Sequence, residues 1–199
     1  MPLCRLKIFT LSIVIIASFL CSVVNAGIVV SGIIQLTNDK NYKTSPSWSP
    51  TGDRIAFSIK KDNNFDIYVL ELKNPSISAY QRITFYDKMD IEPKWSPKGD
   101  KILFSSNRTG EWSIWCKDIA GQDEKIIVTD AKMPGWFPGG KKFAYVKEII
   151  DGNKPVDVVW TKYIDMAGET LLFSDNSERL YPACSVDGQN MAYLKRNGK

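Results

Sequence analysis

The sequence predicts an all-β fold, a β-propeller built from four-stranded antiparallel blades. Two observations support this prediction. A short pattern of residues recurs about every 45 residues, and a fixed period of this size is typical of propeller blades. Gly, Pro and Asn also occur too often to leave room for an amphipathic helix of useful length. We expect about three complete blades with partial ones beside them, so that the propeller is incomplete or open.

The recurring pattern begins with Pro, has Gly six positions later and ends in bulky apolar residues. Its first residues are Pro46, Pro93, Pro134 and Pro182. The matching glycines are Gly52, Gly99, Gly140 and Gly188. Pro sets φ for a turn and Gly accepts positive φ, so the middle of each pattern reads as a tight turn between two strands.

One unit can be followed strand by strand in the first repeat. A strand ends at Trp48, residues 49–52 form the turn, and a second strand covers about residues 54–59. A third strand covers residues 65–72, and the apolar-hydroxyl pair at residues 83–84 marks a closing fourth strand. Such an antiparallel meander is one propeller blade.

The second strand of this unit alternates large and small side chains. Bulky residues occupy one face and small ones the other, so a neighbouring blade can approach closely on the small face. The large residues are Ile55, Phe57 and Ile59, and the small ones are Ala56 and Ser58.

At these residues the chain resembles the TolB-type, WD-repeat-like β-propeller repeat of periplasmic proteins. The resemblance rests on Pro-x-Trp-Ser-Pro-x-Gly-Asp in the first two repeats, on Asp66-Ile67-Tyr68-Val69 and on Arg82-Ile83-Thr84. It covers about Ile33 to Leu194. The third and fourth repeats depart from it at Phe137, Cys184 and Val186. The resemblance implies a propeller of the cell envelope that binds proteins, among them the peptidoglycan-associated lipoprotein of the Tol-Pal system.

The first 26 residues read as a secretion signal. Arg5 and Lys7 precede an uncharged apolar run, and Val24-Asn25-Ala26 offers a cleavage site before Gly27. An uncleaved membrane anchor is the alternative, but the run is short for a bilayer span. We therefore expect a signal peptide at 1–26, a propeller at 27–199, no stable membrane span after cleavage, and a periplasmic or secreted location.

Composition excludes several classes of function. The chain has 199 residues, 26 Lys and Arg, 22 Asp and Glu, and no His. Without His it contains no Ser-His-Asp or Cys-His nucleophile pair and no His-ligated zinc. The formal charge of +4 comes without a clustered basic patch, so nucleic acid is not an expected partner.

No metal site, cofactor site or catalytic residue is predicted. Asp62, Asn64 and Asp66 begin like a calcium loop, but Lys73 stands where its bidentate Glu belongs. Cys116 and Cys184 fall on different strands two blades apart, so we expect free thiols rather than a disulfide.

The predicted strands are too few to form a closed propeller ring. The chain supplies one strand of the kind that comes fourth in a blade, at about residues 33–37, then three full units and the first two strands of another. Propellers typically have about 4 to 8 blades. An incomplete gene product is favoured over a ring completed by another chain or a strained ring of four blades.

The predicted function is a non-enzymatic binding module for a protein or an envelope component. Ligands of propellers meet loops at one end of the blades, here residues 38–45, 60–64, 86–92 and 107–111. The candidate contact residues in these loops are Tyr86, Asp87, Asp90 and Arg108. Alternatives are the propeller part of a prolyl-oligopeptidase-like hydrolase whose catalytic domain is absent, or a truncated gene product.

Overall fold

The computed structural model describes residues 14–15, 33–72, 80–121, 123–173 and 178–195. All regular secondary structure in these residues is β-strand. Within these ranges no helix has the length and apolar character needed to cross a membrane. The predicted signal peptide lies outside the described residues except for Val14 and Ile15.

Three four-stranded antiparallel sheets and one two-stranded sheet form the blades. The first blade contains β3 (Tyr42–Trp48), β4 (Arg54–Lys61), β5 (Asn64–Glu71) and β6 (Tyr80–Arg82). The second contains β7 (Asp90–Trp95), β8 (Lys101–Ser106), β9 (Ser113–Asp118) and β10 (Glu124–Thr129). The third contains β11 (Lys132–Trp136), β12 (Lys142–Asp151), β13 (Lys154–Tyr163) and β14 (Thr170–Leu171). The partial blade contains β15 (Arg179–Cys184) and β16 (Met191–Lys195).

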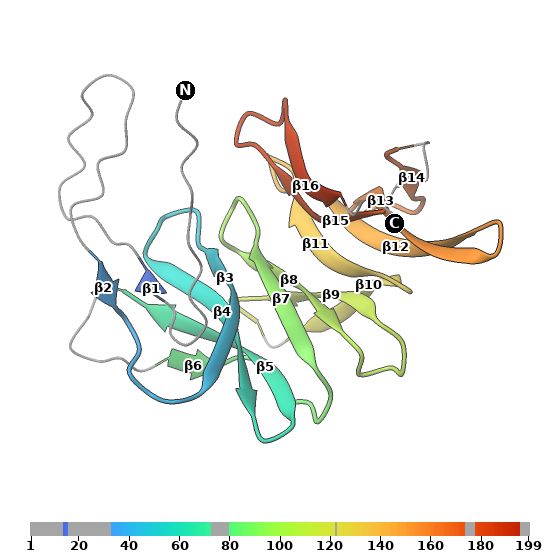
Figure 1. Ribbon diagram of the computed structural model, residues 1–199. Helices are drawn as coiled ribbons and strands as arrows, with labels where there is room; N and C mark the ends of the chain where they lie inside the picture. The colour runs from blue at the N-terminus through green and yellow to red at the C-terminus, as the bar shows by residue number, and fades with distance from the viewer. Residues whose placement is uncertain (1–13, 16–32, 73–79, 122, 174–177, 196–199) are drawn as a thin grey trace.

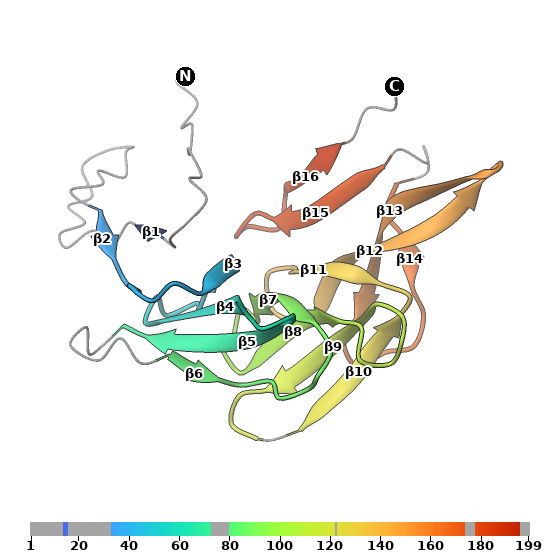
Figure 2. The same cartoon turned by 60° about the horizontal axis from the view of Figure 1, so that its bottom comes forward.

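The blades follow one another in chain order around a common centre (Figures 1 and 2). The first strand of each blade is the innermost, and β3 contacts β7, β7 contacts β11, and β11 contacts β15. The sheets do not close into a ring over the described residues. This confirms the predicted architecture of three complete blades and partial ones.

The hydrophobic core lies between the blades. Ala56 and Ile67 of the first blade pack against Trp95, Ile102 and Phe104 of the second. The small face of β4 therefore receives its neighbour, as the alternation of large and small residues predicts. Similar clusters join the second blade to the third and the third to β15.

In the first, second and partial blades a serine holds the turn between the first two strands, while the third blade has Phe137 at this position. In the second blade the Ser96 hydroxyl donates to Asp100 at 2.7 Å and accepts the backbone N–H of Lys101 at 3.1 Å. Gly99 closes the turn with a φ of 71°, in the left-handed region that favours glycine. This geometry explains why Ser, Pro, Gly and Asp recur together in the pattern.

Each innermost strand carries a β-bulge that the sequence pattern does not reveal. The residue before the first Pro of each repeat has positive φ although it is not glycine, and the pairing register shifts there. The φ values are 55° at Ser45, 59° at Glu92, 58° at Met133 and 54° at Tyr181. A bulge re-aims the side chain that it carries.

One predicted strand lies outside the four blades. The strand expected at about residues 33–37 appears as β2 (Ile34–Gln35), which pairs with β1 (Val14–Ile15) in a separate two-stranded sheet. Within the described residues the partial blade has two strands, so it offers no third strand for β2 to join.

Candidate functional site

The four predicted contact residues lie on two loops that meet at one end of the first and second blades. Tyr86 and Asp87 belong to the β6–β7 loop and are exposed, Tyr86 by 47%. Asp90 begins β7 and is fully buried, and the side chain of Arg108, from the β8–β9 loop, is only 3% exposed. The structure therefore brings the four together as two surface residues above two buried ones.

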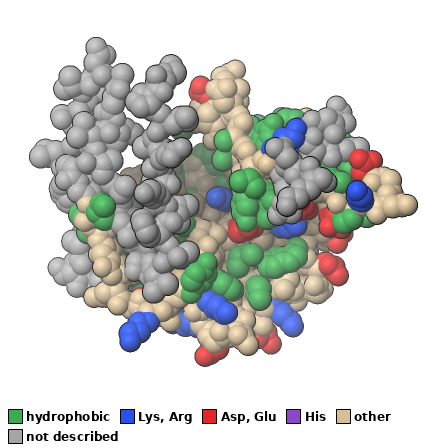
Figure 3. Space-filling model, viewed as in Figure 1, with side chains coloured by type: hydrophobic (Ala, Val, Ile, Leu, Met, Phe, Trp, Pro, Cys, Tyr) green, Lys and Arg blue, Asp and Glu red, His purple; other side chains and the backbone are tan. Residues whose placement is uncertain are grey.

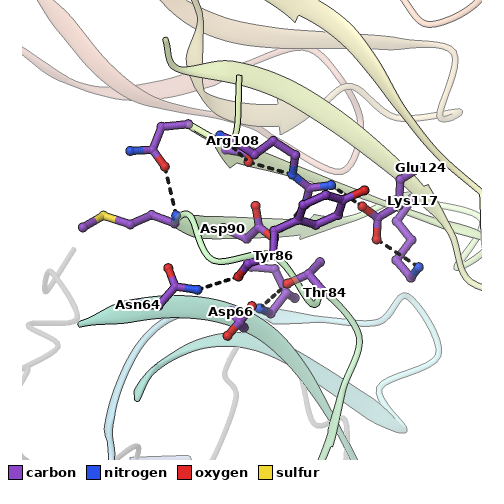
Figure 4. A network of polar contacts seen from close by, with 12 residues as sticks. Asn64, Asp66, Thr84, Tyr86, Asp90, Arg108, Lys117 and Glu124 are labelled. Carbon is purple, nitrogen blue, oxygen red and sulfur yellow. Dashed lines mark hydrogen bonds and ion pairs between the residues drawn. The ribbon is translucent and has the colours of Figure 1, made fainter. Parts of the chain in front are cut away.

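Arg108 is the centre of a buried ionic network (Figure 4). Its Nη2 donates to Oδ2 of Asp90 at 2.7 Å, its Nη1 donates to Oε2 of Glu124, and its Nε donates to Oγ of Ser106 at 3.0 Å. Nζ of Lys117 reaches the other Glu124 oxygen at 3.1 Å. The planar guanidinium suits this arrangement because it presents several donors in fixed directions.

Aromatic rings enclose the same guanidinium. The Tyr86 ring centre lies 3.7 Å from Cζ of Arg108, and the Trp115 and Phe104 ring centres lie at 4.5 Å and 5.3 Å. A cation over an aromatic face is attracted by the ring quadrupole, most strongly where water is excluded. Arg108 therefore fixes the ring of Tyr86, whose outer side faces solvent.

The first blade holds the loop from the other side. Nδ2 of Asn64 donates to the backbone carbonyl of Tyr86 at 2.7 Å, and Figure 4 shows the two side by side. Below the loop, Thr84 Oγ1 accepts the backbone N–H of Ile67 at 2.9 Å. The β6–β7 loop is thus anchored to both blades, so Tyr86 and Asp87 stand on a rigid base.

Burial controls the charges of this network. It raises the pKa of Asp90, and the hydrogen bond and charge of Arg108 oppose that rise. Burial also acts to lower the pKa of Arg108, but Asp90 and Glu124 outweigh it and the pKa is raised. Arg108 is therefore a permanent cation, and its role in this arrangement is to hold the loop in place.

A small cavity lies between the innermost strands, lined by residues from the middle parts of these strands. Its volume is about 170 Å³. Its lining residues come from β3, β7, β11 and β15, and include Glu92, Lys94, Met133, Tyr181 and Pro182. Figure 3 shows a recess near the centre of this view of the molecule, with Lys or Arg atoms visible inside it. Sequence reasoning did not select Glu92, Lys94 or Tyr181, because the bulges that aim residues here leave no mark in the pattern.

A second, larger hollow lies where the innermost strands end and turn into the second strands of the blades. Its volume is about 620 Å³, and it is lined mainly by Trp and Pro residues of the strand-to-strand turns, together with Cys184. Cys184 is half-buried, Cys116 is buried, and both are free thiols. Burial raises the pKa of Cys116 to about 11, so it is a packing residue rather than a nucleophile.

The acidic side chains do not gather into a metal site in the part of the chain that the structure describes. Asp66, one of the calcium-loop candidates, forms an ion pair with Arg82 at 2.9 Å. Asp90 is likewise matched by Arg108. These carboxylates neutralise cations of the protein itself.

Fold and site together define an incomplete β-propeller with a rigid loop face and a small central cavity. Residues 22–199 match the family model of the TolB beta propeller domain. The chain therefore belongs to the TolB beta propeller domain family.

Solved structures agree on the fold. TolB from Acinetobacter baumannii matches with a TM-score of 0.71 and 20% identity, over 84% of this chain and 41% of that one. A protein described as a TolB from Agrobacterium tumefaciens matches with a TM-score of 0.61 and 24% identity, over 81% of this chain and 62% of that one. This chain therefore spans less than two thirds of the length of either protein.

A peptidase shares the same architecture. A puromycin-hydrolysing peptidase from Mycobacterium tuberculosis matches with a TM-score of 0.67 and 12% identity, over 82% of this chain and 27% of that one. Among curated proteins, none is similar enough to count as a match.

Proposed function

We propose that this chain is a secreted or periplasmic, non-enzymatic binding module that holds a protein of the cell envelope on its loop face. The observation that carries the proposal is the β6–β7 loop, where Tyr86 is exposed and yet fixed from beneath by Arg108 at 3.7 Å. An aromatic side chain that is already immobilised loses little entropy when a partner covers it. Asp87, exposed beside it, adds a charge that selects the partner.

Membership of the TolB beta propeller domain family supports a protein as the partner. The partner we propose is the peptidoglycan-associated lipoprotein of the envelope. In this proposal Tyr86 and Asp87 make the contacts, and the buried pair Asp90 and Arg108 positions them. The signal peptide at 1–26, with the propeller at 27–199, would deliver the module to that compartment.

The test is a binding measurement with purified peptidoglycan-associated lipoprotein. The double variant Tyr86→Ala/Asp87→Ala should bind at least about fivefold more weakly than the unaltered chain, because an aromatic anchor typically contributes more than about 1 kcal/mol. Val186→Ala is the matched control: Val186 is 97% exposed but lies on the β15–β16 turn, at the opposite end of the blades. Equal binding by the double variant and the unaltered chain would show that the contact face is wrong.

A second candidate function is the propeller portion of a hydrolase. The likeness to the puromycin-hydrolysing peptidase favours it, although at 12% identity that likeness concerns the fold. This alternative predicts a Gly-x-Ser-x-Gly segment and a later His in the coding sequence after Lys199. Further TolB-type repeats there would instead support the binding module.

A further inference from the structure

We propose that the central cavity is a binding site for a single carboxylate group, with the ammonium of Lys94 as its counter-charge. Only the source of that carboxylate depends on the proposed function, since an acidic side chain of a protein partner would enter from the loop face. The site itself follows from the surroundings of Lys94.

Lys94 is a cation without a fixed partner. Its side chain lines the cavity of about 170 Å³, and within the described residues its ammonium makes no hydrogen bond or ion pair. Burial lowers its pKa, with only the charge of Glu92 acting against this. Lys94 is partly buried. A charge that is partly withdrawn from water and has no fixed partner costs stability, so the fold gains nothing from a lysine here.

Glu92 does not fill the role of partner. Its Oε2 accepts the Ser105 hydroxyl at 2.8 Å and the backbone N–H of Met133 at 3.1 Å, which ties the carboxylate to β8 and β11. Glu92 and Lys94 therefore share the cavity without forming an ion pair. The ammonium remains available to a group that enters from outside.

Comparison among the repeats shows that the scaffold does not require a lysine. The residue at the corresponding position is small in the other three repeats. These residues are Ser47, Gly135 and Ala183. Positions shared by all repeats build the blades, so a departure confined to one inner strand marks a feature particular to the second blade rather than a need of the scaffold.

The rest of the lining selects a carboxylate on an apolar stem. Met133, Pro134 and Pro182 are apolar, and Tyr181 adds a phenol. The cavity is smaller than the 300–1,000 Å³ typical of pockets for whole ligands, so it suits one side chain or one small acid. The charge of Glu92 disfavours a doubly charged anion such as phosphate. The ammonium of Lys94 and the nearby carboxylate of Glu92 together suit a ligand that carries a single negative charge.

The test uses the full chain with two capped tripeptides, acetyl-Gly-Glu-Gly-amide and acetyl-Gly-Gln-Gly-amide, and with sodium acetate. Binding is followed by NMR as saturable shifts of the backbone amides of Met133 and Ala183. The Glu peptide should bind and the Gln peptide should not. Lys94→Met should weaken binding of the Glu peptide about 10- to 100-fold, the usual loss when a hydrogen bond to a charged group is removed. Lys98→Met, which removes an exposed lysine from the β7–β8 turn, should leave it unchanged.

The melting temperature separates a binding role from a structural one. Lys94→Met should melt at or above the temperature of the unaltered chain, because it removes a partly buried charge that has no fixed partner. Lys94→Gln keeps most of the side-chain length without the charge and carries the same binding prediction. Tighter binding of the Glu peptide than of acetate assigns the site to a protein side chain, and equal binding assigns it to a free acid.

The proposal is overturned if the Glu and Gln peptides bind alike, if Lys94→Met and Lys94→Gln bind the Glu peptide as the unaltered chain does, or if no probe shifts the cavity amides. None of these measurements involves the envelope lipoprotein or Tyr86. A failure of the loop-face proposal therefore leaves this result standing, and the reverse also holds.

Discussion

At the scale of single residues, Arg108 shows how a surface loop can depend on a buried charge. The loop position and charge of Arg108 and Asp90 suggest surface contacts when only the sequence is read. In the structure both are buried, and the exposed Tyr86 rests on them. The sequence indicated all four residues of this group. It could not show which of them are buried supports and which are exposed contacts, because burial in a loop depends on how the neighbouring blade packs.

Removal of Arg108 should destabilise the whole chain. Arg108→Ala leaves Asp90 buried without its cation and Glu124 with Lys117 as its remaining partner. Breaking a buried ion pair in this way costs about 3 kcal/mol or more. Urea denaturation followed by tryptophan fluorescence measures the free energy of unfolding. Lys98→Ala, at an exposed turn position, serves as the control and should change it by less than about 0.5 kcal/mol. A loss below about 1 kcal/mol for Arg108→Ala would mean that the network does not hold the fold.

At the scale of strands, the repeat pattern predicted most of the structure. The turn residues and the large-small alternation in β4 placed the strands of the first blade to within a residue or two, and the blade order followed from the period. The pattern could not reveal the bulges at Glu92 and its counterparts, since residues of very different types adopt positive φ there. It also missed the pairing of β2 with β1, which depends on a contact outside the repeats.

Gly135 marks the closest approach between two inner strands. A Cβ atom on this residue would overlap the backbone carbonyl oxygen of Pro182 in β15. Gly135→Ala should therefore push β15 away from β11 and lower the free energy of unfolding by about 1–3 kcal/mol. Hydrogen exchange should also accelerate in β15 and β16.

The matched control for that change is Gly121→Ala. An added Cβ at Gly121 meets its nearest atom at 3.8 Å, an ordinary van der Waals distance. This variant should unfold like the unaltered chain. If Gly135→Ala did the same, the packing of β11 against β15 would be looser than the structure indicates.

At the scale of the whole molecule, the blades form a rigid frame that gathers loops at one end and strand-to-strand turns at the other. The cavity lined by Lys94 lies along the innermost strands, while the exposed Tyr86 and the anchored loops belong to the loop end. Specific recognition is therefore expected there, while the repeated serine turns at the other end serve the scaffold.

Hydrogen-exchange mass spectrometry with and without purified peptidoglycan-associated lipoprotein tests this division of the molecule most directly. Exchange should slow in residues 85–89 and 107–112 when the partner is added. It should not change in the turns at residues 49–53 and 96–100, which lie at the other end of the same blades. Slower exchange confined to those turns, or no change anywhere in the chain, would contradict the account of a protein-binding propeller that uses its loop face.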